Sequence, residues 1–279
     1  MAKHRPILRY YGGKWKLAPW IISFMPSHTV YVEPYGGAAS VLIRKPRSRA
    51  EIYNDVDGDV VNLFQVLRYH ADELARVCAL TPYARLEYDQ SYEPGGTDIE
   101  RARKLVYRSY AGFGGDSYTR HNGFRTRGQN GDLGAAWRNM PSIIYQIADR
   151  MQGVLIECRD ALSVMREYDG PSTLHYVDPP YLMATRRRPR STYVNERTTG
   201  DEKLHEDLAR FLRGLSGFVM LSGYANEIYR DILNDWHCIE RSHMAEKARP
   251  TVEMLWISPN TPAPQLSLHA ELSNTQTGN

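Results

Sequence analysis

The sequence predicts an α/β fold in which helices cover both faces of a mostly parallel sheet and a mainly helical lobe is inserted. Two observations lead to this fold class. Strand-like apolar runs alternate with helical patterns, and residues 82 to about 150 interrupt that alternation with polar, arginine-rich sequence. Strands that alternate with helices imply a parallel sheet covered on both sides. A chain of 279 residues can form one such domain with an insertion.

The first third of the chain predicts two strands and two helices. The strands are "TVYVEP" at 29–34 and "AEIYND" at 50–55, with a linking helix near 38–45. Residues 59–80 then place apolar side chains at helical spacing and predict one long helix.

The last part of the chain repeats the alternation. Strands are predicted at "VLIEC", "STLHYVD", "GFVMLSG" and "TVEMLWIS", with a helix at "DEKLHEDLARFLRGL". Four acids, Glu33, Asp55, Asp160 and Asp178, lie at or just after the ends of predicted strands. Ligands of such sheets bind beyond the carboxyl ends of the strands, so these acids mark the predicted site.

The inserted region is expected to be helical near 98–110 and 135–150. Between these helices, the Asn122-Gly123 pair separates two short polar and aromatic segments and predicts a two-residue β-hairpin over 117–128. We therefore expect a catalytic domain at 1–80 and 151–260, an inserted domain at 81–150, and a disordered tail at 261–279.

Bulk properties exclude several classes of protein. The chain has no apolar run of 18 residues and no apolar segment near its N-terminus, which argues against a membrane protein and a secreted one. Its three cysteines are isolated, so we expect no disulfide frame, no metal and a cytoplasmic location.

The net charge is only +3, but arginine and lysine concentrate at 101–127 and arginine at 186–190. Such clusters attract polyanions.

The segment "YVDPPYL" ends a predicted strand abruptly. Pro179 and Pro180 cannot donate hydrogen bonds to a sheet, so the strand must stop at Asp178. A carboxylate, two stiff carbonyls and the ring of Tyr181 are therefore held just beyond the sheet edge.

Glycines in "YVEPYGGAASVL" follow a strand and open a helix, where backbone approaches a ligand closely. Asp55, about twenty residues on, stands where an acid binds ribose hydroxyls in nucleotide-type folds. The glycines lack the G-x-G-x-x-G pyrophosphate spacing, which favours an adenosyl ligand without phosphates over a dinucleotide.

In this order, "YYGGKW", "YVEPYGGAASVL", "YNDVDGDVVNLF", "IECRDAL", "YVDPPYL" and "EMLWISPN" resemble the Dam-like (alpha-group) DNA adenine-N6 methyltransferases, especially phage and prophage members. The resemblance extends to about residue 260. One departure is that residues 36–40, "GGAAS", lack the second glycine usual in the family's S-adenosylmethionine loop.

The resemblance implies a Rossmann-like methyltransferase sheet with an inserted target-recognition lobe. It also implies methyl transfer from S-adenosylmethionine to the exocyclic amine of a flipped-out adenine in double-stranded DNA, releasing S-adenosylhomocysteine without a metal. Its catalytic residues would be Asp178, Pro179, Pro180 and Tyr181. Its cofactor residues would be Tyr11, Gly12, Gly13, Lys14, Glu33, Pro34, Tyr35, Gly36, Gly37, Asp55 and Asp160. Lys14 would lie near the methionine end of the cofactor, Asp55 at the ribose and Asp160 at the adenine.

Two basic segments are the candidates for DNA contact. The predicted hairpin contributes Arg120, Asn122, Arg125 and Arg127, and its arginines can pair with guanine edges in the major groove. The loop after Tyr181 contributes Arg186, Arg187, Arg188, Arg190 and Tyr193, which would grip the strand that carries the target base.

Three other functions stay open at this point. An NAD-dependent oxidoreductase is opposed by the missing pyrophosphate loop. Cytosine-N4 methylation uses the same amine geometry, but an acid rather than serine at 178 favours adenine. A non-catalytic DNA-binding protein would be expected to have lost residues such as Lys14 and Asp178. We expect a monomer or a homodimer on DNA, in the cytoplasm of a bacterial or phage-infected cell.

Overall fold

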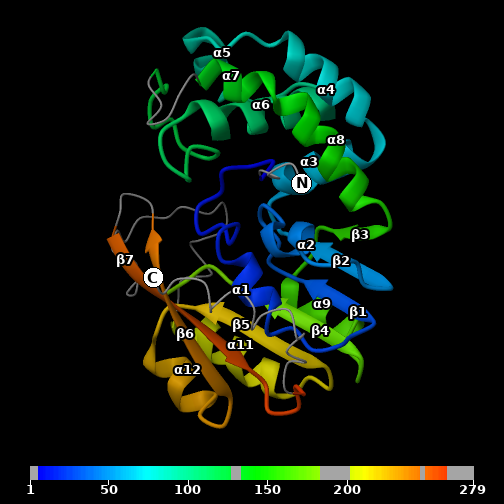
Figure 1. Cartoon of the computed structure of the whole chain (residues 1–279), viewed down its shortest axis with the longest axis vertical. Coiled ribbons are helices and arrows are strands. Elements are labelled where there is room, and N and C mark those ends of the chain that lie inside the picture. Colours follow the sequence, from blue (N-terminus) through cyan, green and yellow to red (C-terminus); the bar gives the residue numbers. More distant parts are fainter. Residues whose placement is uncertain (1–5, 127–132, 183–201, 246–248, 263–279) are drawn as a thin grey trace, which may run out of the picture.

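The fold is taken from a computed structural model that describes residues 6–126, 133–182, 202–245 and 249–262. Within these ranges one sheet has seven strands in the order β3-β2-β1-β4-β5-β7-β6 (Figure 1). The strands are β1 Val30–Glu33, β2 Ala50–Asn54, β3 Val154–Glu157, β4 Thr173–Val177, β5 Phe218–Gly223, β6 His237–Ala245 and β7 Arg249–Ile257. Strands β1 to β5 pair in parallel, whereas β7 is antiparallel to β5 and β6. The predicted mostly parallel sheet is confirmed.

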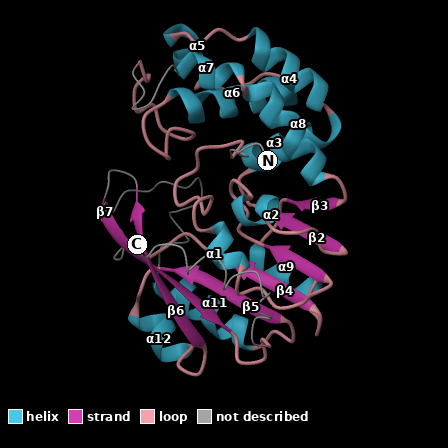
Figure 2. Cartoon of the chain, viewed as in Figure 1, coloured by secondary structure: helices cyan, strands magenta, loops and turns pink. Residues whose placement is uncertain are grey.

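Helices cover both faces of this sheet, as predicted (Figure 2). Tyr31 and Val32 are neighbours in β1 and point to opposite faces of the sheet. Both are buried, but they belong to different apolar clusters. The Tyr31 face packs against α1 (Ala18–Ile22), α2 (Ser40–Arg44) and α3 (Gly58–Tyr69). The opposite face packs against α9 (Ala161–Glu167), α11 (Glu202–Arg213) and α12 (Glu227–Ile232). Alternation along the strands therefore supplies two cores.

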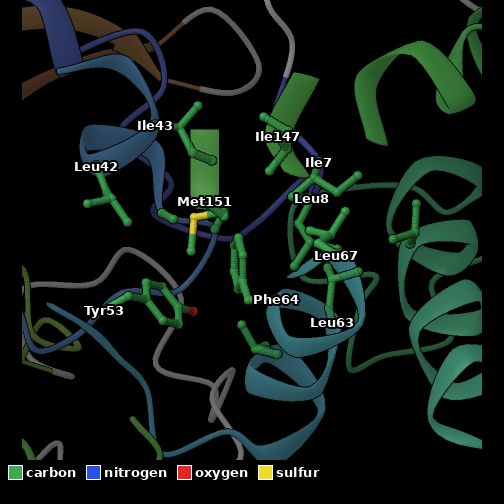
Figure 3. Packing of buried hydrophobic residues seen from close by; sticks show 14 of the residues in the cluster. Ile7, Leu8, Leu42, Ile43, Tyr53, Leu63, Phe64, Leu67, Ile147 and Met151 are labelled. Atoms are coloured by element: carbon green, nitrogen blue, oxygen red, sulfur yellow. The ribbon is translucent and has the colours of Figure 1, made fainter. Parts of the chain in front are cut away.

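A group of helices lies above the sheet in Figure 1. It contains α4 (Ala71–Leu80), α5 (Arg85–Gln90), α6 (Asp98–Ala111), α7 (Leu133–Arg138) and α8 (Met140–Met151). Side chains of α3 and α8 meet the N-terminal segment in one apolar cluster, where Figure 3 shows Leu63 and Phe64 beside Ile7 and Ile147. The helical group and the sheet are thus joined by continuous apolar packing.

The single helix predicted over 59–80 is wrong, because the chain breaks it at His70. This residue has φ −138° and ψ 35°, outside the helical region, and it ends α3 and precedes α4. Its N–H donates to the carbonyl of Val66, and its own carbonyl accepts from the N–H of Leu74. The bend leaves both helix ends bonded, so apolar spacing alone gave no sign of it.

The hairpin predicted over 117–128 does not form within the described residues, which here end at 126. Residues 112–126 instead form a loop closed by one antiparallel bridge between Gly112 and Phe124. A two-residue hairpin of this kind needs positive φ at both central residues, but Asn122 does not have it. Its amide instead donates to Asp116 Oδ1 at 2.8 Å and to the carbonyl of Phe113.

The edge strand β6 was not predicted. Its outer residues are exposed and polar, including His237, Glu240 and Arg241, so the segment lacks the apolar alternation of a half-buried strand. Pairing with β7 along nine residues, rather than burial, defines it. Separately, no helix in the described parts of the chain is long and apolar enough to cross a membrane.

A buried ionic network joins α8 to the sheet. The guanidinium of Arg150 in α8 donates to Glu51 of β2 at 2.6 and 2.9 Å and to the carbonyl of Leu42. The ammonium of Lys45 lies 2.6 Å from Glu51 Oε1, and the two side chains are 1% and 4% exposed. Lys45 also lies 4.4 Å from the centroid of the Tyr31 ring. A single carboxylate therefore balances two cations at the start of β2.

Glu51→Gln is expected to lower the free energy of unfolding by about 3–5 kcal/mol, because it leaves buried cations without a counter-charge. Urea denaturation measures this loss. The matched control is Glu73→Gln, which breaks an exposed pair with Arg76 and should leave stability unchanged. An equal change in the free energy of unfolding for the two variants would show that the buried network stabilises the fold no more than a surface pair does.

Candidate active site

The four acids expected at strand ends do lie at one edge of the sheet. Glu33 ends β1, Asp55 follows β2, Asp160 lies three residues after β3, and Asp178 follows β4. These four strands are parallel neighbours, so their carboxyl ends meet at the same edge. The edge is the one that the fold class predicts for ligands.

The glycine loop between β1 and α2 is held by bonds to the end of β2. Gly36 N–H donates to the carbonyl of Asn54 at 2.8 Å, and Gly37 N–H donates to Asp55 Oδ2 at 2.7 Å. A Cβ at Gly36 would lie 2.1 Å from the ring of Tyr53, so only glycine fits there. Pro34 and Tyr35 lead into this loop, and the hydroxyl of Tyr53 donates to the carbonyl of Gly37 at 2.7 Å.

Ala39 lies in the segment where the resemblance leads one to expect a second glycine. Its φ of 52° lies in the left-handed region, and it is the only non-glycine residue of the described chain with positive φ. It forms the N-cap of α2. An alanine in this conformation costs about 1–2 kcal/mol, so the surrounding loop bonds must hold it.

Asp55 and Asp160, both predicted cofactor residues, also fasten backbone. Asp55 accepts from the N–H groups of Gly37 and Asp57, and burial raises its pKa to about 6. Asp160 caps α9 by accepting from the N–H of Ser163 at 2.8 Å. A carboxylate has about four acceptor positions, so these bonds leave capacity for hydroxyl or amine donors.

Glu33 is 2% exposed, and its carboxyl group turns onto its own strand and the helix that follows. Its Oε2 accepts from the hydroxyl of Tyr31 at 2.6 Å and from the N–H of Leu42 at 2.9 Å. Burial raises the pKa of Glu33 to about 8, the two hydrogen bonds opposing the shift. Burial therefore favours the protonated form of Glu33.

Lys14 and Asp178 form a buried ion pair at the centre of the site. Lys14 Nζ lies 2.8 Å from Asp178 Oδ1, and the side chains are 5% and 17% exposed. The turn at 10–13 delivers Lys14: Gly12 adopts φ 72°, Gly13 N–H donates to the carbonyl of Tyr10, and Lys14 Nζ donates to the carbonyl of Gly12. Tyr11, beside them, is 37% exposed.

Tyr181 packs around the same ammonium group. Lys14 Nζ lies 4.7 Å from the centroid of its ring, and the Tyr224 ring meets it edge-on with centroids 4.6 Å apart. The hydroxyl of Tyr181 donates to Glu253 Oε1. Pro179 is buried and Pro180 half-buried between Asp178 and Tyr181, as expected for a rigid strand end.

Glu253 of β7 was missed by the sequence analysis. It is 2% exposed, and its Oε1 lies 3.7 Å from Lys14 Nζ. The available signal was an acid inside the otherwise apolar run "VEMLWI". Burial raises the pKa of both Asp178 and Glu253, while Lys14 lowers both. One ammonium group thus faces two buried carboxyls.

The predicted DNA residues are only partly described. Arg120 and Arg125 are half-buried in the loop at 112–126, where the guanidinium of Arg125 donates to the carbonyl of Tyr110. Asn122 is exposed but bonds within the loop. The other predicted contacts lie outside the described residues: Arg127, Arg186, Arg187, Arg188, Arg190 and Tyr193.

Within the described ranges, no group of three or more histidine, cysteine or acidic side chains is arranged to hold a metal ion.

Comparison with known proteins agrees with this geometry. The family model for D12 class N6 adenine-specific DNA methyltransferases matches residues 10–247. The chain belongs to this family. The match spans the turn of Lys14, the glycine loop, and the strand β4 that precedes Asp178. It assigns the chain to adenine-N6 chemistry rather than cytosine-N4 methylation, and the family implies S-adenosylmethionine as methyl donor and DNA as substrate.

Relatives of this D12 chain are bacterial DNA adenine methylases. The Escherichia coli K12 protein is 27% identical over 229 residues, covering 77% of this chain and 78% of that protein. The Haemophilus influenzae protein is 27% identical over 250 residues, covering 83% and 84%. The Salmonella typhimurium protein is 24% identical over 263 residues and covers 90% of each. The predicted kinship with phage and prophage members stays a prediction.

Glu33 gives the D12 chain a pH-dependent stability. Between its ordinary pKa of 4.5 and its folded value of about 8, the folded chain keeps a proton that the unfolded chain releases. Stability therefore falls as pH rises through this window, by up to about 1.4 kcal/mol per pH unit.

Glu33→Gln should remove this loss, because the amide oxygen can accept the same two hydrogen bonds without titrating. Chemical denaturation from pH 5 to 9 should show that the free energy of unfolding of the variant, relative to wild type, rises up to about pH 8. A constant difference across that range would mean that Glu33 is ionised in the folded chain.

Proposed function

We propose that this adenine-N6 DNA methyltransferase acts site-specifically on double-stranded DNA, with Asp178, Pro179 and Tyr181 receiving an adenine turned out of the duplex. The observation that supports this most is the buried cluster of Lys14, Asp178 and Tyr181 beside the glycine loop. We also propose a monomer or homodimer on DNA in the cytoplasm of a bacterial or phage-infected cell.

The residues at the sheet edge fit S-adenosylmethionine. The methyl donor carries a carboxylate, ribose hydroxyls and an adenine, and the edge offers one ammonium and several acids. In this proposal Lys14 binds the carboxylate, Asp55 accepts from the ribose, and Asp160 faces the adenine amine. Tyr11, Gly12, Gly13 and the loop at 34–37 would surround the bound donor. When bound, the donor supplies a methyl group on a positively charged sulfur.

Asp178 and Pro179 would prepare the target amine. The lone pair of an exocyclic adenine amine is conjugated with the ring, so the amine is a poor nucleophile. If the Asp178 carboxylate and the Pro179 carbonyl each accept one amine hydrogen, the lone pair is directed away from the ring. The prolines fix the carbonyl, so this geometry needs no rearrangement during the reaction.

The depth of the cluster supports base flipping. A base in a duplex cannot bring its amine to a carboxylate that is 17% exposed, so the base must leave the stack. The cost is a few kcal/mol and is offset by stacking and protein contacts. In the proposal, stacking comes from the ring of Tyr181.

The inserted segment at 81–150 is proposed as the target-recognition lobe, with residues 1–80 and 151–260 as the catalytic domain. The loop at 112–126 would read base edges through Arg120, and the segment at 186–190 would hold phosphates. The predicted hairpin does not form, but the loop can still take this role because its exposed residues include Phe113, His121 and Asn122.

Asp178→Ala should abolish methylation and leave binding of S-adenosylmethionine within a few-fold. Loss of amine orientation should cost several kcal/mol of transition-state stabilisation. Mass spectrometry of nucleosides from DNA incubated with protein and methyl donor gives the rate, and calorimetry gives the binding. A variant that keeps more than about a tenth of the wild-type rate would remove Asp178 from the central role.

Arg120→Ala should relax the choice of methylated sequence at one position, by about 1–3 kcal/mol if it contacts a base. Sequencing of methylated genomic DNA reads this directly. Arg76→Ala, which removes an exposed arginine of α4, is the matched control and should leave the motif unchanged. Uniform slowing at every site would instead assign Arg120 to phosphate contact.

A further inference from the structure

Glu253 is a buried acid that the proposed mechanism does not use. It lies on β7, which is antiparallel to the rest of the catalytic strands, and is 2% exposed. Its Oε1 both accepts from the hydroxyl of Tyr181 and lies 3.7 Å from Lys14 Nζ. The same atom thus contacts the proposed stacking residue and the cation paired with Asp178.

A second carboxyl beside Asp178 has a cost that packing alone would not require. Burying a charge is unfavourable unless it is paired, and two carboxyls here compete for one ammonium. A neutral glutamine could accept the Tyr181 hydrogen bond equally well. The placement of an acid therefore calls for a role that depends on its charge.

The groups that face the two carboxyls come from several elements. Lys14 arrives from the N-terminal turn, Tyr181 follows β4, and Tyr224 follows β5. Tyr176, Glu33 and Tyr229 also act on Asp178 or Glu253 electrostatically. Among these, Lys14 is the only cation, so its position decides how the negative charge is balanced.

We propose that Glu253 is a positioning residue for methyl transfer, which fixes the ring of Tyr181 through its hydroxyl and shares Lys14 with Asp178 as a second carboxylate. The inference rests on the proposed function. It goes beyond that function because it assigns to an acid of β7 the orientation of the Tyr181 ring and the charge balance of Lys14.

The geometry explains how both tasks serve the reaction. Anchoring the Tyr181 hydroxyl stops the ring from turning about its bonds, so its face stays ready to stack. When the hydrogens of an amine approach Asp178, Lys14 must yield part of its contact. Glu253 keeps a carboxyl group 3.7 Å from that ammonium, so the charge of Lys14 stays balanced from β7 while Asp178 faces the base.

Three variants separate these tasks. Glu253→Gln keeps an acceptor for Tyr181 and removes the charge, Tyr181→Phe removes the hydroxyl and keeps the ring, and Glu253→Ala removes both contacts. The matched control is Glu240→Gln, an exposed acid on the neighbouring strand β6. Methylation by the wild-type chain is measured first, because its absence would refute the proposed function, whereas the present inference is tested by differences from an active wild type.

Glu253→Gln should lower kcat about 10- to 100-fold and keep the Kd for S-adenosylmethionine within threefold. Its acid limb of activity should move to lower pH, because loss of a negative neighbour makes Asp178 easier to ionise. A carbon-13 NMR titration of the Asp178 carboxyl in the free protein should show the same downward shift of its pKa. The fold-loss of kcat in Glu253→Ala should equal the product of the losses in Glu253→Gln and Tyr181→Phe. Glu240→Gln should keep the wild-type kcat.

Two results would overturn the inference. One is an unchanged acid limb and unchanged Asp178 titration in Glu253→Gln, which would mean that Glu253 does not share Lys14 as a carboxylate. The other is a Glu253→Ala variant that unfolds at lower denaturant while Glu253→Gln keeps wild-type kcat, which would make the residue a packing element only.

Discussion

The buried ion pair between Lys14 and Asp178 is the contact on which the site depends. It joins the N-terminal turn to the end of β4, two segments more than 160 residues apart in the sequence. Each side is fixed independently: the turn by the positive φ of Gly12 and a hydrogen bond from Gly13 to Tyr10, the strand end by two prolines. Because neither partner can move far, the carboxylate points to one place beyond the sheet.

The same turn also supports the loop proposed to contact DNA. The ring of Tyr10 stacks on Tyr118 with centroids 4.4 Å apart and planes 23° apart. A Cβ at Gly115 would lie 3.2 Å from the backbone of Tyr11, so the loop and the turn are in direct contact. A ligand that displaces this loop must shift the turn or slide across it. The loop proposed for recognition and the turn that carries Lys14 therefore support each other directly.

Much of this site could be predicted from the sequence because its determinants are local. Pro179 and Pro180 end the strand next to Asp178 whatever surrounds them, and acids after parallel strands must meet at one edge. The rest depends on tertiary contacts. Glu253 reaches the site only because β7 pairs antiparallel with β5, and the Asn122-Gly123 turn signal was overridden by bonds from Asn122 to Asp116 and Phe113. The break at His70 and the exposed strand β6 likewise carry no clear periodic signal.

The balance of charge at the sheet edge explains which ligands it suits. Burial raises the pKa of Glu33 to about 8 and that of Asp55 to about 6, and it raises those of Asp178 and Glu253 as well. In the described part of the chain, Lys14 is the ammonium that pairs with Asp178 and faces Glu253, so carboxyl groups outnumber ammonium groups around it. Hydroxyls, amines and positively charged groups are the ligands that satisfy such a surface without leaving a buried acid unpaired. An adenine amine and a sulfonium methyl donor both meet that requirement, whereas a pyrophosphate would bring only acceptors and negative charge beside the carboxyl groups of Asp55, Asp178 and Glu253.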